Sequence, residues 1–564
     1  MKRSVIATDR PVPHALAAAA ALLLAGAMLS TATQAQTTAP DSGQILQQNQ
    51  QRAPAPPQPA AAIQMPAAES NAIAAGGAKV TLQAVQFSGN SALSSEALQA
   101  LVAGAIGQAL DLAGLRALAD GITAHYRAAG YPFARAVLPP QSLADGQLRI
   151  NLIEGRYSRA VVNTAEPAWL AAAQAQLSSL KPGEVITTGP LERAVLALSD
   201  LPGVRATATM QPGDAPGTGE LVVDLSRSAP LTGLVSLDNH GNRYSGQHRL
   251  LVGADWNSPF RLGDQLSLRL LGTDESLWLG SVTYASPVPW GNLGLRASAS
   301  LAHTSYELGK EFNALGATGT ADVASLGLSW PVLRSSTANL RLSAQLQHKR
   351  LHDQQITLDE RKQSTSLPLS LDFDLRDNLA GGGLSYGSLS WTPGRLKLSS
   401  QAVASDVLGT HGSFSRLNID VVRQQTLTPQ LQAWVRGSGQ WTDGNLDSSE
   451  RVSLGGANGV RAYPSGEATG DQGWLVQAEL RTQVGPVAPF AFADAGVVRI
   501  NARPLAGGGT NQRKLAGGGI GVRWQAGSLD AQLALAWRSH GGPAQSDGGS
   551  GSQPRVWGQV AWRF

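Results

Sequence analysis

The chain has 564 residues, too many for one ordinary domain, and its 44 Lys and Arg nearly balance its 40 Asp and Glu. A net charge of +4 over this length gives no nucleic-acid footprint, and the absence of cysteine excludes disulfides, thiol catalysis and cysteine–zinc sites. With 63 Gly and only 15% charged residues, the composition is typical of a large all-β protein with many turns.

The chain begins with the pattern of a targeting segment. Basic residues near the start are followed by an apolar run of Ala and Leu over residues 15–29, and small residues stand at Thr33 and Ala35. We therefore expect a secretory signal peptide over residues 1–35. A transmembrane anchor is the alternative, but the run is short for a span, and no later stretch approaches ~18 uninterrupted apolar residues. Insertion into a membrane would then require a β-barrel.

Residues 36–78 combine a short polar helix with a linker. The Gln-rich residues 41–52 can form a helix that is capped by Asp41 or Ser42. Residues 53–66 are rich in Pro and Ala, a composition that favours an extended, polyproline-like conformation. A disordered spacer is the alternative for the whole segment.

Two α/β modules with the same order of elements, β-α-α-β-β, follow over residues 79–156 and 157–228. In the first module we expect a strand from Val80 that ends at Gly89, helices over 93–102 and 112–129, and strands over 133–138 and 148–153. In the second we expect a strand over 157–162, helices over 169–180 and 191–198, and strands over 204–210 and 220–225. Each module is too small to bury a deep ligand site.

From residue 229 to the end, alternation with a period of two dominates the sequence. In residues 293–301 and 529–538, apolar side chains alternate with Arg, Ser, Gln or Asp, so each strand has one apolar and one polar face. A transmembrane barrel needs this pattern because lipid lies outside it and water inside. A soluble β-sandwich also alternates, but the long segments and the frequent Arg and Gln favour a barrel. At roughly 21 residues per strand and turn, residues 229–564 give about 16 strands.

Residues 454–481, LGGANGVRAYPSGEATGDQGWLVQAELR, resemble the sixth extracellular loop and following strand of two-partner secretion transporters, the haemolysin secretion/activation family. The family motif Val-Arg-Gly-Tyr/Phe stands here as Val460, Arg461, Ala462 and Tyr463, so Ala replaces the Gly. This departure weakens any requirement for glycine at the third position. The arginine and the aromatic ring of the motif are retained.

Two further motifs extend the resemblance. The motif Phe-x-Asp-x-Gly matches residues 492–496, with Asp494 at its centre. Residues 237–246 resemble the first barrel strands of the family, with Ser245 in place of the usual Thr. Because the motifs occur in the family's order, the resemblance covers nearly the whole mature chain.

The resemblance also implies roles for charged residues. In the wider superfamily the loop arginine contacts the strand aspartate, which correspond here to Arg461 and Asp494, and Glu479 is an additional acceptor. A planar guanidinium that meets carboxylates in a narrow lumen would hold the loop inside the barrel. The alternative is that Arg461 lies on an exposed loop.

The fold that the resemblance implies is a transmembrane antiparallel β-barrel over residues 229–564, preceded by two POTRA (polypeptide-transport-associated) domains. The barrel would lie in the cell outer membrane, in contact with its lipid, with the POTRA domains in the periplasm. The implied function is to recognise and secrete a large partner exoprotein, of the haemolysin or adhesin kind, which the POTRA domains capture by strand addition. Residues 41–52 would act as a removable plug.

The last strand alternates as well and ends at Phe564. A terminal aromatic strand resembles the signal that the outer-membrane barrel assembly machinery reads, so this machinery is an expected partner. The alternative is an ordinary strand that happens to end in Phe.

Three other functions compete with secretion. A barrel-assembly insertase of the same superfamily shares the loop motif but typically carries more POTRA domains, and a passive porin has none. An outer-membrane hydrolase would need catalytic residues, yet the sequence has no G-x-S-x-G, phosphate-loop or H-E-x-x-H motif. Its nine His residues are scattered. We therefore expect no enzymatic activity, cofactor, metal or nucleic-acid partner.

Overall fold

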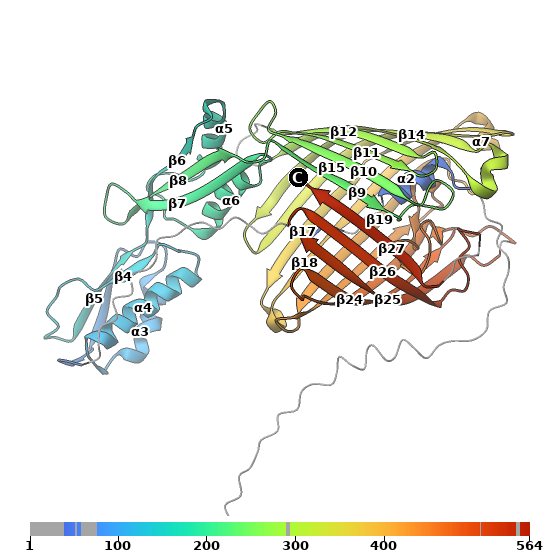
Figure 1. The fold of residues 1–564 in the computed structure, drawn as a ribbon. Coiled ribbons are helices and arrows are strands. Elements are labelled where there is room, and N and C mark those ends of the chain that lie inside the picture. Colours follow the sequence, from blue (N-terminus) through green and yellow to red (C-terminus); the bar gives the residue numbers. More distant parts are fainter. Residues whose placement is uncertain (1–38, 51–53, 58–75, 289–293, 508, 549–552) are drawn as a thin grey trace, which may run out of the picture.

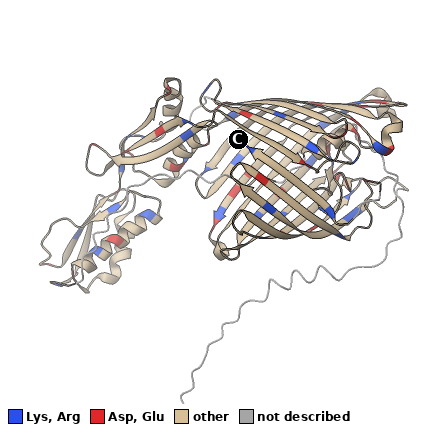
Figure 2. Cartoon of the chain, viewed as in Figure 1, with Lys and Arg blue, Asp and Glu red and all other residues tan. Residues whose placement is uncertain are grey.

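The structure is a computed structural model, in which two α/β units form an arm beside a large barrel (Figure 1). It describes residues 39–50, 54–57, 76–288, 294–507, 509–548 and 553–564. The expected signal peptide and most of the expected linker lie outside the described residues. Figure 2 shows both signs of charge scattered over the arm and the barrel, so neither part is of one sign.

The first unit packs helices against a three-stranded sheet of order β2-β5-β4. Its elements are β1 (Val80–Thr81), β2 (Ala84–Ser88), α3 (Ser95–Val102), η1 (Ala103–Ala105), β3 (Ala109–Leu110), α4 (Leu112–Ala128), β4 (Arg135–Val137) and β5 (Gln147–Ile153). Ser94 caps α3 and Asp111 caps α4, each by accepting a hydrogen bond from a backbone N–H of the first turn. Leu98 and Ile122 bury the apolar faces of these helices against Ile150 of the central strand.

The single strand expected from Val80 to Gly89 is in fact two strands. The N–H groups of Gln83 and Ala84 both point at the carbonyl of Gly146, which starts the pairing of β2 with β5. The two residues before this bend pair with β3 instead, a strand that the sequence analysis did not predict. A two-residue ladder leaves too short a pattern to be recognised by alternation.

The second unit repeats the arrangement with the sheet order β6-β8-β7. Its elements are β6 (Arg156–Thr164), α5 (Pro167–Leu177), α6 (Thr188–Ser199), β7 (Val204–Pro212) and β8 (Thr218–Arg227). Both helices begin before the expected residue: Pro167 occupies the first turn of α5, where its missing N–H costs nothing. Trp169, Leu191 and Leu221 belong to the core between the helices and the sheet.

A closed antiparallel barrel follows the arm. Its strands are β9 (Leu231–Asp238), β10 (Arg249–Asn257), β11 (Gln265–Thr273), β12 (Trp278–Pro287), β13 (Arg296–Glu307), β14 (Thr318–Arg334), β15 (Ala338–Gln355), β16 (Leu358–Ser366), β17 (Leu369–Asp377), β18 (Gly383–Leu398), β19 (Gly412–Thr426), β20 (Leu431–Thr442), β23 (Gln472–Thr482), β24 (Val487–Arg499), β25 (Gln512–Ala526), β26 (Leu529–His540) and β27 (Arg555–Arg563). Both β16 and β17 pair with β15 and with β18, so they form one strand of the wall, interrupted before Pro368. This confirms the expected 16-stranded barrel within the described residues.

Burial in the barrel is the reverse of burial in a soluble protein. Outward-facing Leu237, Leu301 and Val560 are more than half exposed, whereas the lumenal Arg436 and Gln477 are each 3% exposed. A barrel wall of this kind is stable only when lipid surrounds it, because exposing so much apolar surface to water is unfavourable. The alternation that predicted the barrel is thus the alternation between lipid and lumen.

Candidate functional site

The segment between β20 and β23 folds back into the lumen, and we call residues 443–471 the lumenal loop. It contains η4 (Ser448–Glu450), β21 (Val452–Ser453) and β22 (Thr469–Gly470), and β21 pairs with β22. Beyond this short ladder the chain turns tightly, since the N–H of Val460 donates to the carbonyl of Leu454 at 2.7 Å. A Cβ at Gly459 would lie 2.0 Å from that same carbonyl oxygen, so this turn requires glycine.

Arg461, at the tip of the lumenal loop, is 3% exposed and reaches two strands of the wall. Its Nε and Nη2 donate to the two carboxylate oxygens of Asp494 on β24, at 2.8 and 2.6 Å, and its backbone N–H donates to the same group at 3.1 Å. Its Nη1 donates to Glu479 on β23 at 2.5 Å. The guanidinium also lies 3.7 Å from the ring centroid of Phe492. The structure thus brings the three predicted charged residues together, and Arg461 is not on an exposed loop.

Glu479 is shared with two arginines that the sequence analysis did not single out. Arg481 and Arg523 donate to it at 2.7 and 3.0 Å, and each guanidinium stacks on a lumenal aromatic ring, of Trp434 and Phe490 respectively. Cation–π contact and charge-assisted bonds reinforce each other here. The sequence marks these two arginines only by their places on the polar faces of β23 and β25.

The other residues of the loop motif, Val460, Ala462 and Tyr463, are buried in packing contacts and form no ion pairs. Val460 and Tyr463 are fully buried, and the Tyr463 hydroxyl reaches the backbone carbonyls of His540 and Gly542 at 2.8 and 3.0 Å. Burial raises the pKa of Tyr463 to about 12, so the phenol stays a donor at neutral pH. Ala462, which replaces the family's Gly, faces Gly517 on β25, where an added Cβ would lie 2.4 Å from the Ala462 methyl carbon. Because Gly517 has no side chain, the methyl group of Ala462 fits where the family motif has glycine.

The third motif, residues 237–246, lies against the tip of the loop. Ser465 donates from Oγ to the carbonyl of His240 at 2.7 Å, and Asn242 donates from Nδ2 to the carbonyl of Ser465 at 2.9 Å. Burial lowers the pKa of His240 to about 4, which keeps its imidazole neutral at neutral pH. Ser245 is buried and its carbonyl accepts a hydrogen bond from Thr273. The first extracellular loop therefore braces the lumenal loop.

A second element occupies the lumen: helix α2 (Ser42–Gln50), which Figure 1 shows inside the barrel. Its first turn is anchored at two points, because Ser42 donates from N and Oγ to Asp353 on β15 at 2.7 and 2.8 Å. Asp41 accepts from Ser448 of the lumenal loop at 2.6 Å and lies 3.3 Å from Nζ of Lys362. The sequence predicts a helix here but not its partners on the wall.

Helix α2 and η4 are in close contact at a glycine. A Cβ at Gly43 would lie 2.2 Å from Oγ of Ser448 and 2.6 Å from the backbone N of Ser449. Behind this contact, Glu450 of η4 pairs with Lys349 at 2.7 Å and with Arg416 at 2.9 Å. The helix therefore rests on a turn of the lumenal loop that is itself held by buried charges.

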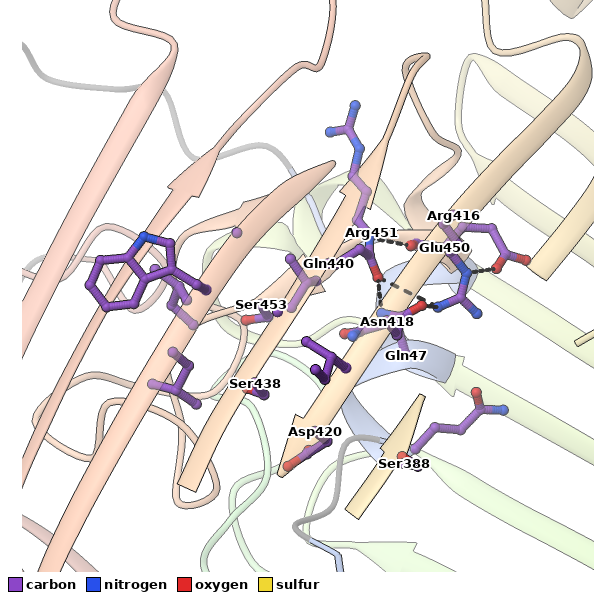
Figure 3. Close-up of a pocket in the computed structure, with 18 of the residues that line it drawn as sticks. Gln47, Ser388, Arg416, Asn418, Asp420, Ser438, Gln440, Glu450, Arg451 and Ser453 are labelled. Carbon is purple, nitrogen blue, oxygen red and sulfur yellow. Dashed lines mark hydrogen bonds and ion pairs between the residues drawn. The ribbon is translucent and has the colours of Figure 1, made fainter. Parts of the chain in front are cut away.

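A polar cavity of about 300 Å³ remains beside the helix (Figure 3). Gln47 of α2 lines it, with Asn418 and Gln440 of the wall, whose side chains are joined by a 2.7 Å hydrogen bond. No group of His, Cys, Asp and Glu suited to hold a metal occurs within the described residues. Nor does the described part of the chain contain a helix long and apolar enough to cross a membrane. Amides, hydroxyls and paired charges therefore give the lumen a polar lining.

Comparison with known proteins adds the family. The profile of the haemolysin secretion/activation protein ShlB/FhaC/HecB matches residues 217–524, and that of the ShlB-type POTRA domain matches residues 80–155. The heme/hemopexin transporter protein HuxB of Haemophilus influenzae is 28% identical over 67% of this chain and 67% of its own length. The outer membrane transporter CdiB of Escherichia coli is 25% identical over 86% of this chain and 81% of its own.

Solved structures agree on the fold. CdiB from Escherichia coli covers 88% of this chain and 93% of its own with a TM-score of 0.67 and 21% identity. BamA from Haemophilus ducreyi without its first three POTRA domains covers 86% of this chain and 100% of its own, with a TM-score of 0.51 and 13% identity. BamA is thus a distant neighbour in fold. With the family profile spanning more than half of its residues, the chain belongs to the haemolysin secretion/activation protein ShlB/FhaC/HecB family and is an outer-membrane two-partner secretion transporter.

Proposed function

We propose that this transporter captures its exoprotein on the periplasmic arm and passes it through the lumen. Helix α2 leaves the lumen to open this path. The observation that supports this is that a separate polar helix lies in the lumen, while Pro57, seven residues after it, lies at the mouth beside the arm. Arg376, near the periplasmic end of β17, contacts the carbonyl of Pro57 at 3.5 Å. The helix can therefore be withdrawn along the barrel axis without any break in the wall.

Capture by the arm follows from its sheet edges. We place the POTRA domains at residues 79–156 and 157–228, and their sheets end in β2 and β4, and in β6 and β7. Unpaired edge backbone can add a strand from an extended chain, which is the recognition mode of β-augmentation. An unfolded exoprotein offers such a strand, so the arm supplies specificity and the barrel supplies the path.

No chemical reaction is part of this proposal. The lumenal carboxylates of Glu450, Glu479 and Asp494 are paired with arginines and lysines. Folding of the exoprotein outside the cell would supply the energy for transport. Phe564 stacks 4.9 Å from Trp562 on the outer face and lies over Gly233 of the first barrel strand. Such an exposed terminal aromatic pair supports recognition by the barrel assembly machinery before the barrel closes.

Removal of residues 79–227 tests the proposal. The truncated chain should still reach the outer membrane while export of the cognate exoprotein is lost, measured by immunoblot of the culture medium and of purified outer membranes. Continued export without the arm would contradict capture by the POTRA domains. A general loss of other outer-membrane proteins in a strain lacking the full chain would instead favour the insertase function.

A further inference from the structure

Side chains on the outer face of β14 to β19 form rows that run across neighbouring strands of the barrel wall. One row consists of Leu328, Ala344, Leu369, Trp391 and Leu417, each opposite the next in the antiparallel register. The row is apolar and includes an indole, a side chain enriched where hydrocarbon meets lipid headgroups. It therefore belongs to the lipid-facing belt, and the next row toward the extracellular end still carries the exposed Leu326 and Leu346.

Toward the extracellular end, the same face becomes polar and basic within four residues of each strand. The row that contains His348, Thr365 and Arg395 lies above the belt, and the row that contains Gln363 and Lys397 lies above that. All of these side chains face away from the lumen, since their strand neighbours, such as Lys349 and Leu396, are buried inside. A change from apolar to cationic side chains is the one expected where hydrocarbon gives way to headgroups.

A hollow of about 470 Å³ lies on this boundary. Its lower wall is apolar, formed by Leu346, Leu367 and Pro393, and its upper wall carries Arg395 and Lys397. The hollow occurs where the wall strand is interrupted between β16 and β17. It therefore presents apolar surface to the hydrocarbon and positive charge to the headgroups at one place.

The cations of this hollow are available for a ligand. Arg395 and Lys397 are exposed, and neither has an ion pair or side-chain hydrogen bond among the described residues. Arg350, opposite Gln363, is also exposed; the nearby carboxylate of Asp322 is bonded to His303 at 2.6 Å. No carboxylate lines the hollow within the part of the chain that the structure describes. The local charge is positive and complementary to phosphate.

We propose that this hollow binds a phosphorylated glycolipid of the outer leaflet, with an acyl chain against Leu346, Leu367 and Pro393 and a phosphate held by Arg395 and Lys397. Residues two apart on one strand face lie roughly 6.6–6.8 Å apart along the strand, which suits two cations that grip one phosphorylated headgroup. Such a lipid would fix the height and tilt of the barrel beside the extracellular ends of β15 to β18. The proposal concerns the outer wall and is independent of the transport path.

The experiment uses the full-length protein in detergent, titrated with purified diphosphorylated lipid A and followed by native mass spectrometry. The wild type should retain one lipid saturably, and Arg395→Gln/Lys397→Gln should weaken retention roughly tenfold or more, because two charge-assisted contacts are lost. The control Lys181→Gln/Arg205→Gln removes two exposed charges from the arm and should bind as the wild type does.

Two competitors separate the parts of the ligand. Inorganic phosphate and a dephosphorylated form of the same glycolipid should each fail to displace the bound lipid at equal concentration, since each lacks half of the recognised chemistry. Equal retention by the wild type and Arg395→Gln/Lys397→Gln would overturn the proposal. Full displacement by inorganic phosphate would also overturn it, because the apolar wall would then contribute nothing.

Discussion

At the scale of single residues, the lumen is organised by buried charges that are shared among partners. Among the described residues, Arg461 is the one cation paired with Asp494, whereas Glu479 has three arginines around it. Removing a partner from Asp494 therefore leaves a buried carboxylate unpaired, while removing one from Glu479 does not. The cost of an uncompensated buried charge is a few kcal/mol where the site is desolvated and less where water enters.

This asymmetry gives a matched pair of variants. We expect Arg461→Ala to abolish or strongly reduce secretion at normal outer-membrane abundance, because the lumenal loop loses its anchor on β24. Arg461→Lys should rescue poorly, since an ammonium cannot supply the planar fork that Asp494 accepts. Arg481→Ala is the control, because Glu479 keeps Arg461 and Arg523. Secretion is measured in the medium against barrel abundance in the membrane; normal secretion by Arg461→Ala would reject the anchored-loop mechanism.

A second residue-scale prediction concerns Gly43, where helix α2 meets the lumenal loop. Gly43→Ala should raise the helix propensity of α2 yet weaken its docking, because the new methyl carbon overlaps Ser448 and the backbone of Ser449. Overpacking of this kind costs about 1–3 kcal/mol, enough to raise the undocked population roughly tenfold. Single-channel conductance in planar bilayers should show more frequent open events than the wild type, while Gln50→Ala, at an exposed position, should not. Identical traces for Gly43→Ala would mean that this contact does not hold the helix.

The charged residues of the lumen were predictable only in part. Arg461, Asp494 and Glu479 could be named from the sequence because a family motif marks them. Lys349 and Glu450 could not, since the pair joins residues about 100 positions apart and neither stands in a local pattern. A polar face on a strand predicts that side chains meet the lumen, but it does not say which of them meet each other.

At the scale of elements, alternation with a period of two predicted the barrel because lipid and lumen impose it on every strand. It did not predict the interruption between β16 and β17, where Pro368 lacks the N–H that would continue the ladder. It also did not locate η4 or the short strands of the lumenal loop, whose positions depend on contacts with the wall. The short helix α2 was predicted from composition and capping, and its burial came from tertiary contacts that no sequence pattern records.

The prediction at this scale is that α2 restricts the pore. Deletion of residues 36–66 should raise conductance in planar bilayers, because the helix occupies the lumen. Secretion should stay largely intact, because the helix is not one of the strands that close the barrel. Asp41→Ala/Ser42→Ala keeps the whole segment but removes the side-chain contacts with Ser448, Lys362 and Asp353, and leaves only the backbone N–H of residue 42 to donate to Asp353. It should therefore give an intermediate conductance. If the deletion left conductance unchanged, the segment would be only a spacer.

At the scale of the whole molecule, the second POTRA unit is docked firmly on the periplasmic turns of the barrel. Leu262, in the turn between β10 and β11, is buried in the core of that unit. Arg334 at the end of β14 donates two hydrogen bonds to Asp200, both at 2.6 Å, and Ser336 bonds to Glu192. Oγ of Ser258, in the same turn as Leu262, also donates to the carbonyl of Pro202 at 2.6 Å. The arm is therefore held by an apolar anchor and by several polar contacts, which set its orientation at the barrel mouth.

The last prediction tests this docking. Leu262→Asp should release the arm, because the new carboxylate would lose its hydration in the apolar core of the POTRA unit unless the two parts separate. The chain has no cysteine, so Gln211→Cys in the arm and Thr428→Cys in a periplasmic turn accept a unique pair of spin labels. Pulsed electron paramagnetic resonance should show a narrow distance distribution in the labelled parent and in the control Arg261→Ala, and a broad one in Leu262→Asp. A narrow distribution in Leu262→Asp would show that the polar contacts alone hold the arm. Loss of secretion together with the broad distribution would show that the orientation of the arm, and not only its presence, delivers the exoprotein to the lumen.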